Sequence, residues 1–301
     1  MLEIVVDSSA CLTRGEAARL NVTMVPMTYK LDGAPMQETF MGENGDFAAA
    51  IEQERITDAA GTSPDTFLAA FERLAATGAD VLCITTSQKV SSCYRNACKA
   101  ADQVRSAIRK AAGATSREAN SAAAAGAAKL PRIAVLDSQS TICGVEGLAA
   151  LARELDEAGS SFDDIVARLE QARCDQGIAF SVPSTAALRR TGRIAMIPLS
   201  VGKLLNRYPV LTVREGSVKH VGTARGITAL ARDLVACVPT DARRDLTITF
   251  FGAQTTTCAE LLKAVKAQFP LINVRVKQGG PVLSSILGQG AVSLAWGRAL
   301  A

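Results

Sequence analysis

Short apolar runs alternate with longer amphipathic segments along the first half of the chain. The runs are rich in Val, Ile and Leu, which favour β-strands, whereas the longer segments repeat their apolar residues at helical spacing. Strands are expected at 3–7, 22–31 with a break at Pro26, 81–85 and 132–138, and helices at 45–54, 63–78, 91–110 and 143–159. This strand-then-helix order implies right-handed crossovers and a parallel sheet that helices cover on both faces.

The segment 63–78 carries the clearest start and stop signals among these helices. Ser63 can cap the first turn, Pro64 suits the first helical position, and Gly78 ends the pattern. Because apolar residues recur between these signals at helical spacing, the segment is predicted to bury one face.

The second half of the chain mixes two kinds of connection. A capped helix is expected at 160–177, and the further elements are strands at 178–182, 209–216, 217–222, 246–253 and 272–278 and helices at 184–192, 227–238 and 258–269. Glu215-Gly216 joins two of these strands as a hairpin turn, whereas helices connect others, so the sheet of this half should be mixed. Residues 279–297 are interpreted only as a Gly-rich segment.

Chain length and this change of pattern together predict two domains of the α/β class. The 301 residues are about twice the ~150-residue prior for a single domain. We therefore expect an N-terminal α/β domain with a parallel, Rossmann-like sheet over residues 1–159. A C-terminal α/β domain with a mixed sheet is expected over residues 160–301.

Composition excludes several classes to which the protein could belong. Hydrophobic residues make up 48% of the chain and charged residues 21%, which is typical of a globular protein. The 33 Lys and Arg exceed the 29 Asp and Glu but are scattered, so no nucleic acid partner is expected. Neither a signal peptide nor an integral membrane segment is recognisable. Eight cysteines without a C-x-x-C pair indicate free thiols, and hence a cytoplasmic protein.

Catalytic and metal chemistry find little support in the sequence. His220 is the single histidine and lies in a predicted strand, so neither a Ser-His-Asp centre nor a histidine metal site is expected. A P-loop is absent, and the glycines of 288–293 lack the third glycine of a dinucleotide fingerprint. The Ala-rich segment 111–129 is assigned no function. We therefore predict no catalytic residue, no metal and no cofactor.

Hydroxyl and carboxyl side chains gather where three predicted strands end. They are Asp7, Ser8 and Ser9 after the first strand, Thr85, Thr86, Ser87, Ser91 and Ser92 after the strand 81–85, and Asp137, Ser138 and Ser140 at the end of the strand 132–138. The carboxyl ends of parallel strands meet at one edge, where open α/β sheets bind ligands. These residues should therefore share one rim, and two roles stay open for them, as helix caps and turns or as ligand contacts.

Motifs distributed over nearly the whole chain resemble those of the DegV family. They are IVVDSSACL, VPMTYKLDG, GTSPDTF, TTSQKVSSCYRNA, VLDSQSTICGVEGL, LRRTGRIAMIPLSVGKLLNRYPVLTVREG and GGPVLSSILGQGAVSLAWG, in this order. Their order and spacing carry the resemblance. It implies a two-domain α/β fold that holds a long-chain fatty acid, such as palmitate or oleate, in an apolar tunnel.

The resemblance also implies which residues hold the carboxylate of the fatty acid. By position, Thr62 and Ser91 match the carboxylate-binding Thr and Ser of the family, and Ser63 and Ser92 are their neighbours. Arg193 matches a Gly-Arg-Ile turn that faces a partner. In bacteria, such proteins present the acid to a separate fatty-acid kinase for phospholipid synthesis. The chain is therefore expected to be a lipid-binding subunit without catalytic residues of its own.

One pocket position departs from the family pattern and keeps two alternatives open. The family has a histidine in a C-terminal H-T-G-P-G segment, where this chain has Ile286. Without that imidazole the ligand could differ, so the chain could instead be a small-molecule phosphoryl-acceptor domain related to dihydroxyacetone kinase, or a sensor of a different amphiphile. A narrow apolar tunnel would favour the fatty-acid carrier, whereas a small, polar and basic pocket would favour the phosphoryl acceptor.

Overall fold

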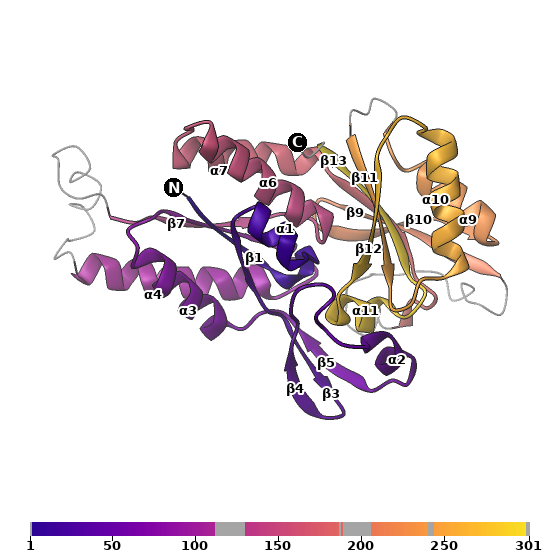
Figure 1. Cartoon of the computed structure of the whole chain (residues 1–301), viewed down its shortest axis with the longest axis horizontal. Coiled ribbons are helices and arrows are strands. Elements are labelled where there is room, and N and C mark those ends of the chain that lie inside the picture. Colours follow the sequence, from indigo (N-terminus) through magenta and orange to yellow (C-terminus); the bar gives the residue numbers. More distant parts are fainter. Residues whose placement is uncertain (1, 112–129, 187, 189–205, 240–243, 299–301) are drawn as a thin grey trace.

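Two large β-sheets and a small third one organise the described part of the chain, for which we use a computed structural model (Figure 1). The structure describes residues 2–111, 130–186, 188, 206–239 and 244–298. Of the Ala-rich segment 111–129, only residue 111 is described. Most of the helix expected at 184–192 also lies outside the described residues, and so does Arg193.

The N-terminal sheet is parallel throughout, as the sequence predicts. Its order is β2-β1-β6-β7, and each neighbouring pair runs in the same direction. The strands are β1 (Glu3–Asp7), β2 (Val22–Val25), β6 (Val81–Thr85) and β7 (Ile133–Asp137). Because both faces are covered, these strands read as continuous apolar runs rather than as alternating ones.

Helices cover both faces of the N-terminal sheet. Val5 and Cys83 point to the face packed by α3 (Pro64–Ala75) and α4 (Cys93–Ala111). Ile4 and Leu82 point to the opposite face, which α6 (Cys143–Glu157) and α7 (Phe162–Ala172) cover (Figure 1). The predicted cap of α3 is confirmed, since Ser63 Oγ accepts a hydrogen bond from Thr66 N at 3.1 Å and Pro64 opens the helix.

The position of α7 bears on where the N-terminal unit ends. Ile165 and Leu169 of this helix are buried in the same apolar cluster as Ile4 and Leu148. The sequence places the boundary at residues 159 and 160, ahead of α7. We keep the division into two units as a proposal and place its boundary after α7, because this helix contributes its apolar face to the N-terminal core.

A small antiparallel sheet is absent from the sequence-based prediction. Its order is β4-β3-β5, and with the helix α2 beside it the elements are β3 (Thr28–Leu31), β4 (Ala34–Gln37), α2 (Phe47–Glu52) and β5 (Ile56–Ala60). The prediction recovers the extended segment that contains β3, and the helix α2, but neither β4 nor β5. All four residues of β4 are exposed, so apolar periodicity gives no signal there.

The C-terminal sheet is mixed, as predicted. Its order is β10-β9-β8-β13-β11-β12, in which β11 and β12 are parallel and the other neighbours antiparallel. The strands are β8 (Gly177–Ser181), β9 (Arg207–Arg214), β10 (Ser217–Arg225), β11 (Arg244–Phe251), β12 (Val274–Gly279) and β13 (Val292–Arg298). The helices α9 (Ile227–Val235) and α10 (Thr256–Gln268) cover one face of it (Figure 1).

The hairpin between β9 and β10 is confirmed, and its glycine also contacts the N-terminal unit. Glu215 and Gly216 both have positive φ, at 50° and 77°, as the tight hairpin turn requires. A Cβ on Gly216 would lie 2.4 Å from Ser87 Oγ, and this hydroxyl donates a 2.8 Å hydrogen bond to the carbonyl of Gly216. The turn therefore docks directly onto the loop after β6.

The other face of the C-terminal sheet is turned toward the N-terminal unit. Its buried residues, among them Ile178 and Phe180, share an apolar cluster with Cys11 and Ile142 from the N-terminal half. The helix α11 (Pro281–Leu287), which the sequence does not predict, lies at this junction and contacts β5 and α2. In the described part of the chain, no helix is both long and apolar enough to span a bilayer.

Candidate functional site

The three loops that follow β1, β6 and β7 interlock at one rim of the N-terminal sheet, as predicted. Thr86 N donates to the Asp7 carboxylate at 2.7 Å, and Thr86 Oγ1 donates to the carbonyl of Ser140 at 3.2 Å. Ser87 N donates to the same carbonyl at 2.8 Å. The polar residues gathered there hold the loops to one another before any ligand is considered.

Most hydroxyls of this rim are used internally, in the way that the cap-and-turn interpretation expects. Ser8 Oγ donates to the Glu38 carboxylate, and Ser138 Oγ donates to the carbonyl of Ser140 at 3.1 Å. Three rim residues also line the cavity next to the rim, and these are Ser9, Thr86 and Ser91. Thr86 and Ser91 combine both roles, because their hydroxyls make internal hydrogen bonds as well.

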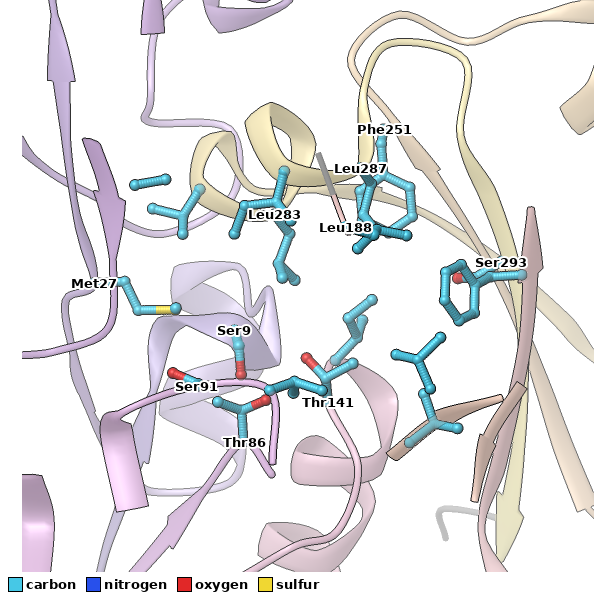
Figure 2. Close-up of a pocket in the computed structure, with 18 of the residues that line it drawn as sticks. Ser9, Met27, Thr86, Ser91, Thr141, Leu188, Phe251, Leu283, Leu287 and Ser293 are labelled. Carbon is cyan, nitrogen blue, oxygen red and sulfur yellow. The ribbon is translucent and has the colours of Figure 1, made fainter. Parts of the chain in front are cut away.

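A cavity lies between the two units, bounded by the rim, α11 and the inner face of the C-terminal sheet. The part of it that the centre of a water-sized sphere can reach is about 80 Å³, below the ~300–1,000 Å³ typical of ligand pockets, so its walls lie close together. Most of its lining is aliphatic or aromatic, and none of the described residues in the lining carries a charge. Figure 2 shows Ser9, Ser91 and Thr86 on one side, with Leu283, Leu287 and Phe251 across from them.

Among the predicted head-group residues, Ser91 lines the cavity. Its hydroxyl donates to the Cys93 thiol at 3.3 Å and accepts from Cys93 N at 3.3 Å, which fixes it at the start of α4. The loop before α3 packs closely against it, because a Cβ on Gly61 would lie 2.9 Å from the hydroxyls of both Ser91 and Ser92. The two sequence segments that the resemblance singles out therefore meet.

Three other predicted residues lie behind the cavity wall. Thr62 is completely buried, and its side chain lies near the Cys93 thiol. Ser63 is occupied as the cap of α3, and Ser92 Oγ accepts a long 3.5 Å hydrogen bond from Asn96. None of these three is among the cavity-lining residues that the structure describes.

The remaining two predicted positions differ in what the structure says of them. Ile286 lines the cavity, but from the helix α11 rather than from a loop. Its apolar side chain extends the lining at the position where the resemblance implies a histidine. Arg193 lies outside the described residues.

Burial governs the ionisable groups beside the cavity. It raises the pKa of Asp7, an effect that hydrogen bonds from Ser9 and Thr86 oppose. Burial also raises the pKa of the Cys93 thiol to about 12, with the negative charge of Asp7 adding to the effect, so the thiol stays protonated at neutral pH. Cys93 is therefore a poor candidate for nucleophilic chemistry.

Glu38 is the site residue that sequence reasoning missed. It is 1% exposed and accepts hydrogen bonds from Ser8 Oγ and from Val282 N, the latter at 3.0 Å. Burial raises its pKa to about 7. Because Val282 belongs to α11, this carboxyl joins the N-terminal rim to the helix that closes the cavity. The sequence gives no signal for it, since its partners are 30 and 244 positions away.

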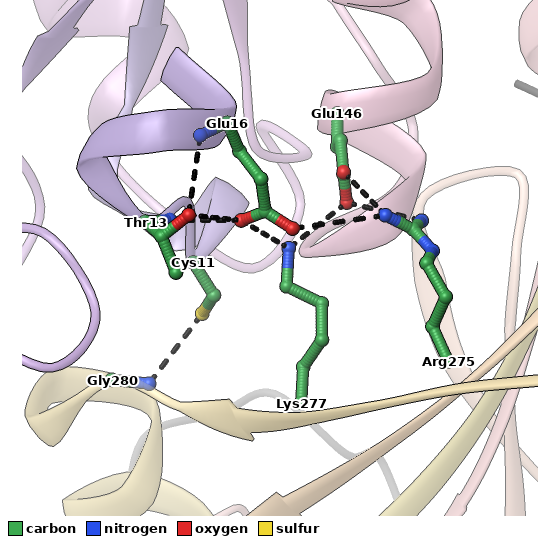
Figure 3. Close-up of polar contacts among 7 residues, drawn as sticks. All are labelled: Cys11, Thr13, Glu16, Glu146, Arg275, Lys277 and Gly280. Atoms are coloured by element: carbon green, nitrogen blue, oxygen red, sulfur yellow. Dashed lines mark hydrogen bonds and ion pairs between the residues drawn. The ribbon is translucent and has the colours of Figure 1, made fainter. Parts of the chain in front are cut away.

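An ionic cluster fixes the two units together on another part of the same junction (Figure 3). Glu146 of α6 accepts from Arg275 at 2.7 Å and from Lys277 at 3.2 Å, both on β12. Lys277 also contacts Glu16 of the short helix α1 (Arg14–Arg19) at 3.1 Å. Burial opposes the charge of Lys277, but Glu146 and Glu16 outweigh it and raise the pKa of this amine. The sequence pattern gives no signal for this cluster, because Lys277 lies 261 positions from Glu16 and 131 from Glu146.

Other candidate chemistry lies away from the cavity. His220 lies in β10, half-exposed, and its Nε2 is 3.1 Å from Thr223 Oγ1. All eight cysteines are free thiols. Across the described ranges, no group of His, Cys, Asp and Glu side chains is arranged to hold a metal ion.

Comparison with known proteins places the chain among relatives of its own length. The model of the DegV family matches residues 1–298. A DegV domain-containing protein of Halalkalibacterium halodurans is 25% identical over 302 residues, which is 98% of each chain. Another, from Streptomyces coelicolor, is 24% identical over 296 residues, 97% of this chain and 96% of its own.

Solved structures share the fold over the whole length. One of them is a DegV family protein from Thermus thermophilus that is reported to bind fatty acid. It is 26% identical to this chain with a TM-score of 0.79, and the match covers 99% of each chain. A fatty-acid-binding DegV family protein from Streptococcus agalactiae has a TM-score of 0.79 at 18% identity, again over 99% of each chain. The predicted fold class is confirmed by these likenesses.

Proposed function

The chain belongs to the DegV family, and on this premise we propose that it binds a long-chain fatty acid, such as palmitate or oleate, in the cavity between its units. The observation that carries the proposal is the lining of this cavity, which is apolar, uncharged in its described residues, and edged by hydroxyls on one side. The solved relative from Thermus thermophilus, described by its fatty-acid binding, supports the same ligand class. In this proposal the chain is a carrier and has no catalytic residue.

The carboxylate is held in this proposal by hydroxyls. Ser91 is the contact that we favour, with Ser9 and Thr86 beside it on the same side of the cavity (Figure 2). Thr62 and Ser63 then act behind the wall, by shaping the loop that packs against Ser91, whereas Ser92 is assigned no contact with the head group. Hydroxyl donors suit a carrier, because they orient the head group without the strong pairing of a charged hydrogen bond to Arg or Lys.

The acyl chain supplies most of the affinity. Burial of each methylene contributes about 0.8 kcal/mol, so a chain of palmitate length offers on the order of 11 kcal/mol before the costs of ordering. Phe251, Leu283 and Leu287 are among the side chains that would cover it. Ile286 adds to this apolar surface, so its replacement of the family histidine favours the tail at the expense of a head-group donor.

A carrier needs a partner that uses its ligand. We propose that the chain presents the fatty acid to a separate fatty-acid kinase in the cytoplasm, and so supplies phospholipid synthesis, as the family resemblance implies. Arg193 is the residue we assign to the partner-facing surface on the basis of its motif. The free thiols are consistent with a reducing compartment.

The phosphoryl-acceptor alternative is less consistent with the cavity. A phosphorylated or phosphate-accepting small molecule calls for cationic or closely spaced polar groups, and the described lining contains no Lys, Arg or His. His220, the residue type to which such domains attach substrate, lies on β10 and does not line the cavity.

The proposed ligand can be tested on protein purified without added lipid. Native mass spectrometry, followed by solvent extraction of the released ligand, should find a long-chain fatty acid in a ratio of about one per chain. A protein that is empty after purification, and stays empty after incubation with palmitate and with oleate, would refute the proposal.

A further inference from the structure

One hydroxyl lies on the far side of the cavity, away from the proposed head group. Ser293 of β13 is 2% exposed and lines the cavity, and its Oγ has no hydrogen-bond partner among the described residues. In Figure 2 it lies across the cavity from Ser9, Ser91 and Thr86, on the side where Phe251 and Leu188 provide apolar surface. A polar atom is therefore buried where the tail of the ligand would lie.

The register of the sheet explains why this hydroxyl faces the cavity. Along β13, Val292 and Leu294 pack into the cluster beneath α9 and α10, so Ser293 between them points to the opposite face. Its cross-strand neighbour on one side is Phe180 of β8, which also lines the cavity. An apolar residue at this position would pack well in such surroundings, but the chain has a serine.

A second unpartnered hydroxyl lies directly beside the first. Thr249 of β11 is paired with Ser293 in the antiparallel register, so both side chains leave the same face. Thr249 is completely buried, and its Oγ1 also lacks a hydrogen-bond partner within the described residues. Two adjacent buried hydroxyls thus have unused hydrogen-bonding capacity, and of the two, Ser293 lines the cavity.

Such a pair is informative because buried polar groups in proteins nearly always have partners. The partner assigned here is an uncharged group, because the one charged group of the ligand, its carboxylate, is already placed at Ser91 across the cavity. An alcohol oxygen fits, because it can both accept a hydrogen bond from the Ser293 hydroxyl and donate one to it. A saturated acyl chain would leave this hydroxyl unsatisfied.

We infer that the cavity selects a hydroxylated fatty acid, with Ser293 as the residue that binds the hydroxyl of its acyl chain and Thr249 as the residue behind it. The inference rests on the proposed function, since it names a substrate class for the same cavity. Because Ser293 lies across the cavity from Ser91, the ligand hydroxyl belongs to the part of the chain remote from the carboxylate.

The test compares stearate with positional isomers of hydroxystearate on the intact wild-type chain freed of lipid. Affinities are measured by displacement of a fluorescent fatty acid. An isomer whose hydroxyl lies in the half of the chain remote from the carboxylate should bind about tenfold more tightly than stearate, the gain expected of one buried hydrogen bond. An isomer with the hydroxyl next to the carboxylate should show no such gain.

Ser293→Ala supplies the residue-level test. In this variant the preference for the distal isomer should fall to about unity, while stearate binds as well as before or better. If the wild-type chain binds stearate but prefers no isomer, the inference is wrong and the carrier function stands. A preference that survives in Ser293→Ala also refutes the assigned residue. If neither stearate nor any isomer binds, the proposed function and this inference both fail.

Discussion

Ser91 and Ser92 are adjacent serines that the fold places in different surroundings. Ser91 lines the cavity, whereas Ser92 lies behind its wall with Asn96. If Ser91 holds the carboxylate, Ser91→Ala removes a hydrogen bond to a charged group, and affinity for palmitate should fall about 10- to 100-fold. Titration of a fluorescent fatty acid measures the effect, with Ser92→Ala as the matched control.

The control should stay within about twofold of the wild type, because Ser92 does not reach the ligand space. Equal losses in the two variants would show that the loop as a whole, and not the Ser91 hydroxyl, positions the head group. A loss confined to Ser92→Ala would contradict the assignment.

The buried carboxyl of Glu38 should make the stability of the protein depend on pH. Burial raises its pKa from the ordinary 4.5 to about 7, so the folded protein binds this proton more strongly than the unfolded chain. The free energy of unfolding should therefore fall as the pH rises from about 4.5 to about 7, by up to about 3 kcal/mol from this group. Burial acts on Asp7 in the same direction.

Glu38→Gln should reduce this slope without abolishing it, because Asp7 remains. Urea denaturation at several pH values between 5 and 8 measures the slope, and Glu72→Gln on the exposed face of α3 is the control. An unchanged slope in Glu38→Gln would mean that the carboxyl keeps an ordinary pKa in the folded protein.

Sequence reasoning at the residue scale succeeds where the partners are local. Ser63 and Pro64 were identifiable because a helix cap involves residues three positions apart. The hydroxyls at the rim were identifiable because strand ends of a parallel sheet share an edge. Glu38 and Ser293 were not, since their surroundings come from residues that only the tertiary fold brings near.

At the scale of elements, buried ion pairs join the helix α6 to the strand β12. The Glu146 side chain is fully buried, and Lys277 beside it is 9% exposed. Glu146→Gln would leave Arg275 and Lys277 with Glu16 as their nearby carboxylate, so the variant should lose about 3–5 kcal/mol of unfolding free energy. Urea denaturation of this variant tests it, with Glu157→Gln on the exposed end of α6 as control.

A second substitution separates charge from packing in this cluster. Adding Lys277→Met to Glu146→Gln removes a buried charge that has lost one of its two carboxylate partners, so the double variant should lose less than the sum of the two single variants. Additive losses would indicate that Glu146 and Lys277 stabilise the junction independently of each other.

The elements that the sequence did not predict share a physical cause. β4 and β5 are short and mostly exposed or half-exposed, and α11 is a seven-residue helix within a Gly-rich stretch. Their local signals are weak, and they are held by contacts with one another, since α11 packs on β5, β3 and α2. The buried strand β13 was missed too, because it lies in the same Gly-rich stretch as α11. By contrast, the long helices and the other buried strands have strong periodicity and were predicted.

At the scale of the whole molecule, the parallel and mixed sheets followed from the order of elements, but the junction between them did not. Periodicity tells which residues are buried, and it does not tell against which unit they pack. Cys11, Ile142 and Phe180 read as ordinary core residues of their own segments, and they meet in one cluster across the junction. The cavity is a property of that junction, so its lining could be listed only from the structure.

A ligand that fills this junction should stabilise the whole fold. A ligand that binds only the folded state, present at a hundred times its Kd, adds about 2.7 kcal/mol. For a chain of this size, palmitate should then raise Tm by roughly 5 °C over the lipid-free protein. Octanoate at the same concentration should shift Tm far less, because each missing methylene costs about 0.8 kcal/mol of binding.

A charge placed in the cavity tests whether this stabilisation arises there. Leu283→Asp puts a carboxylate into the apolar lining, so palmitate should no longer shift the Tm of this variant. Leu271→Asp makes the same change at a side chain that is 98% exposed, and it should keep the full shift. If palmitate raises the Tm of both variants equally, the fatty acid binds elsewhere on the protein, because only one of the two substitutions alters the surface that the acyl chain would contact.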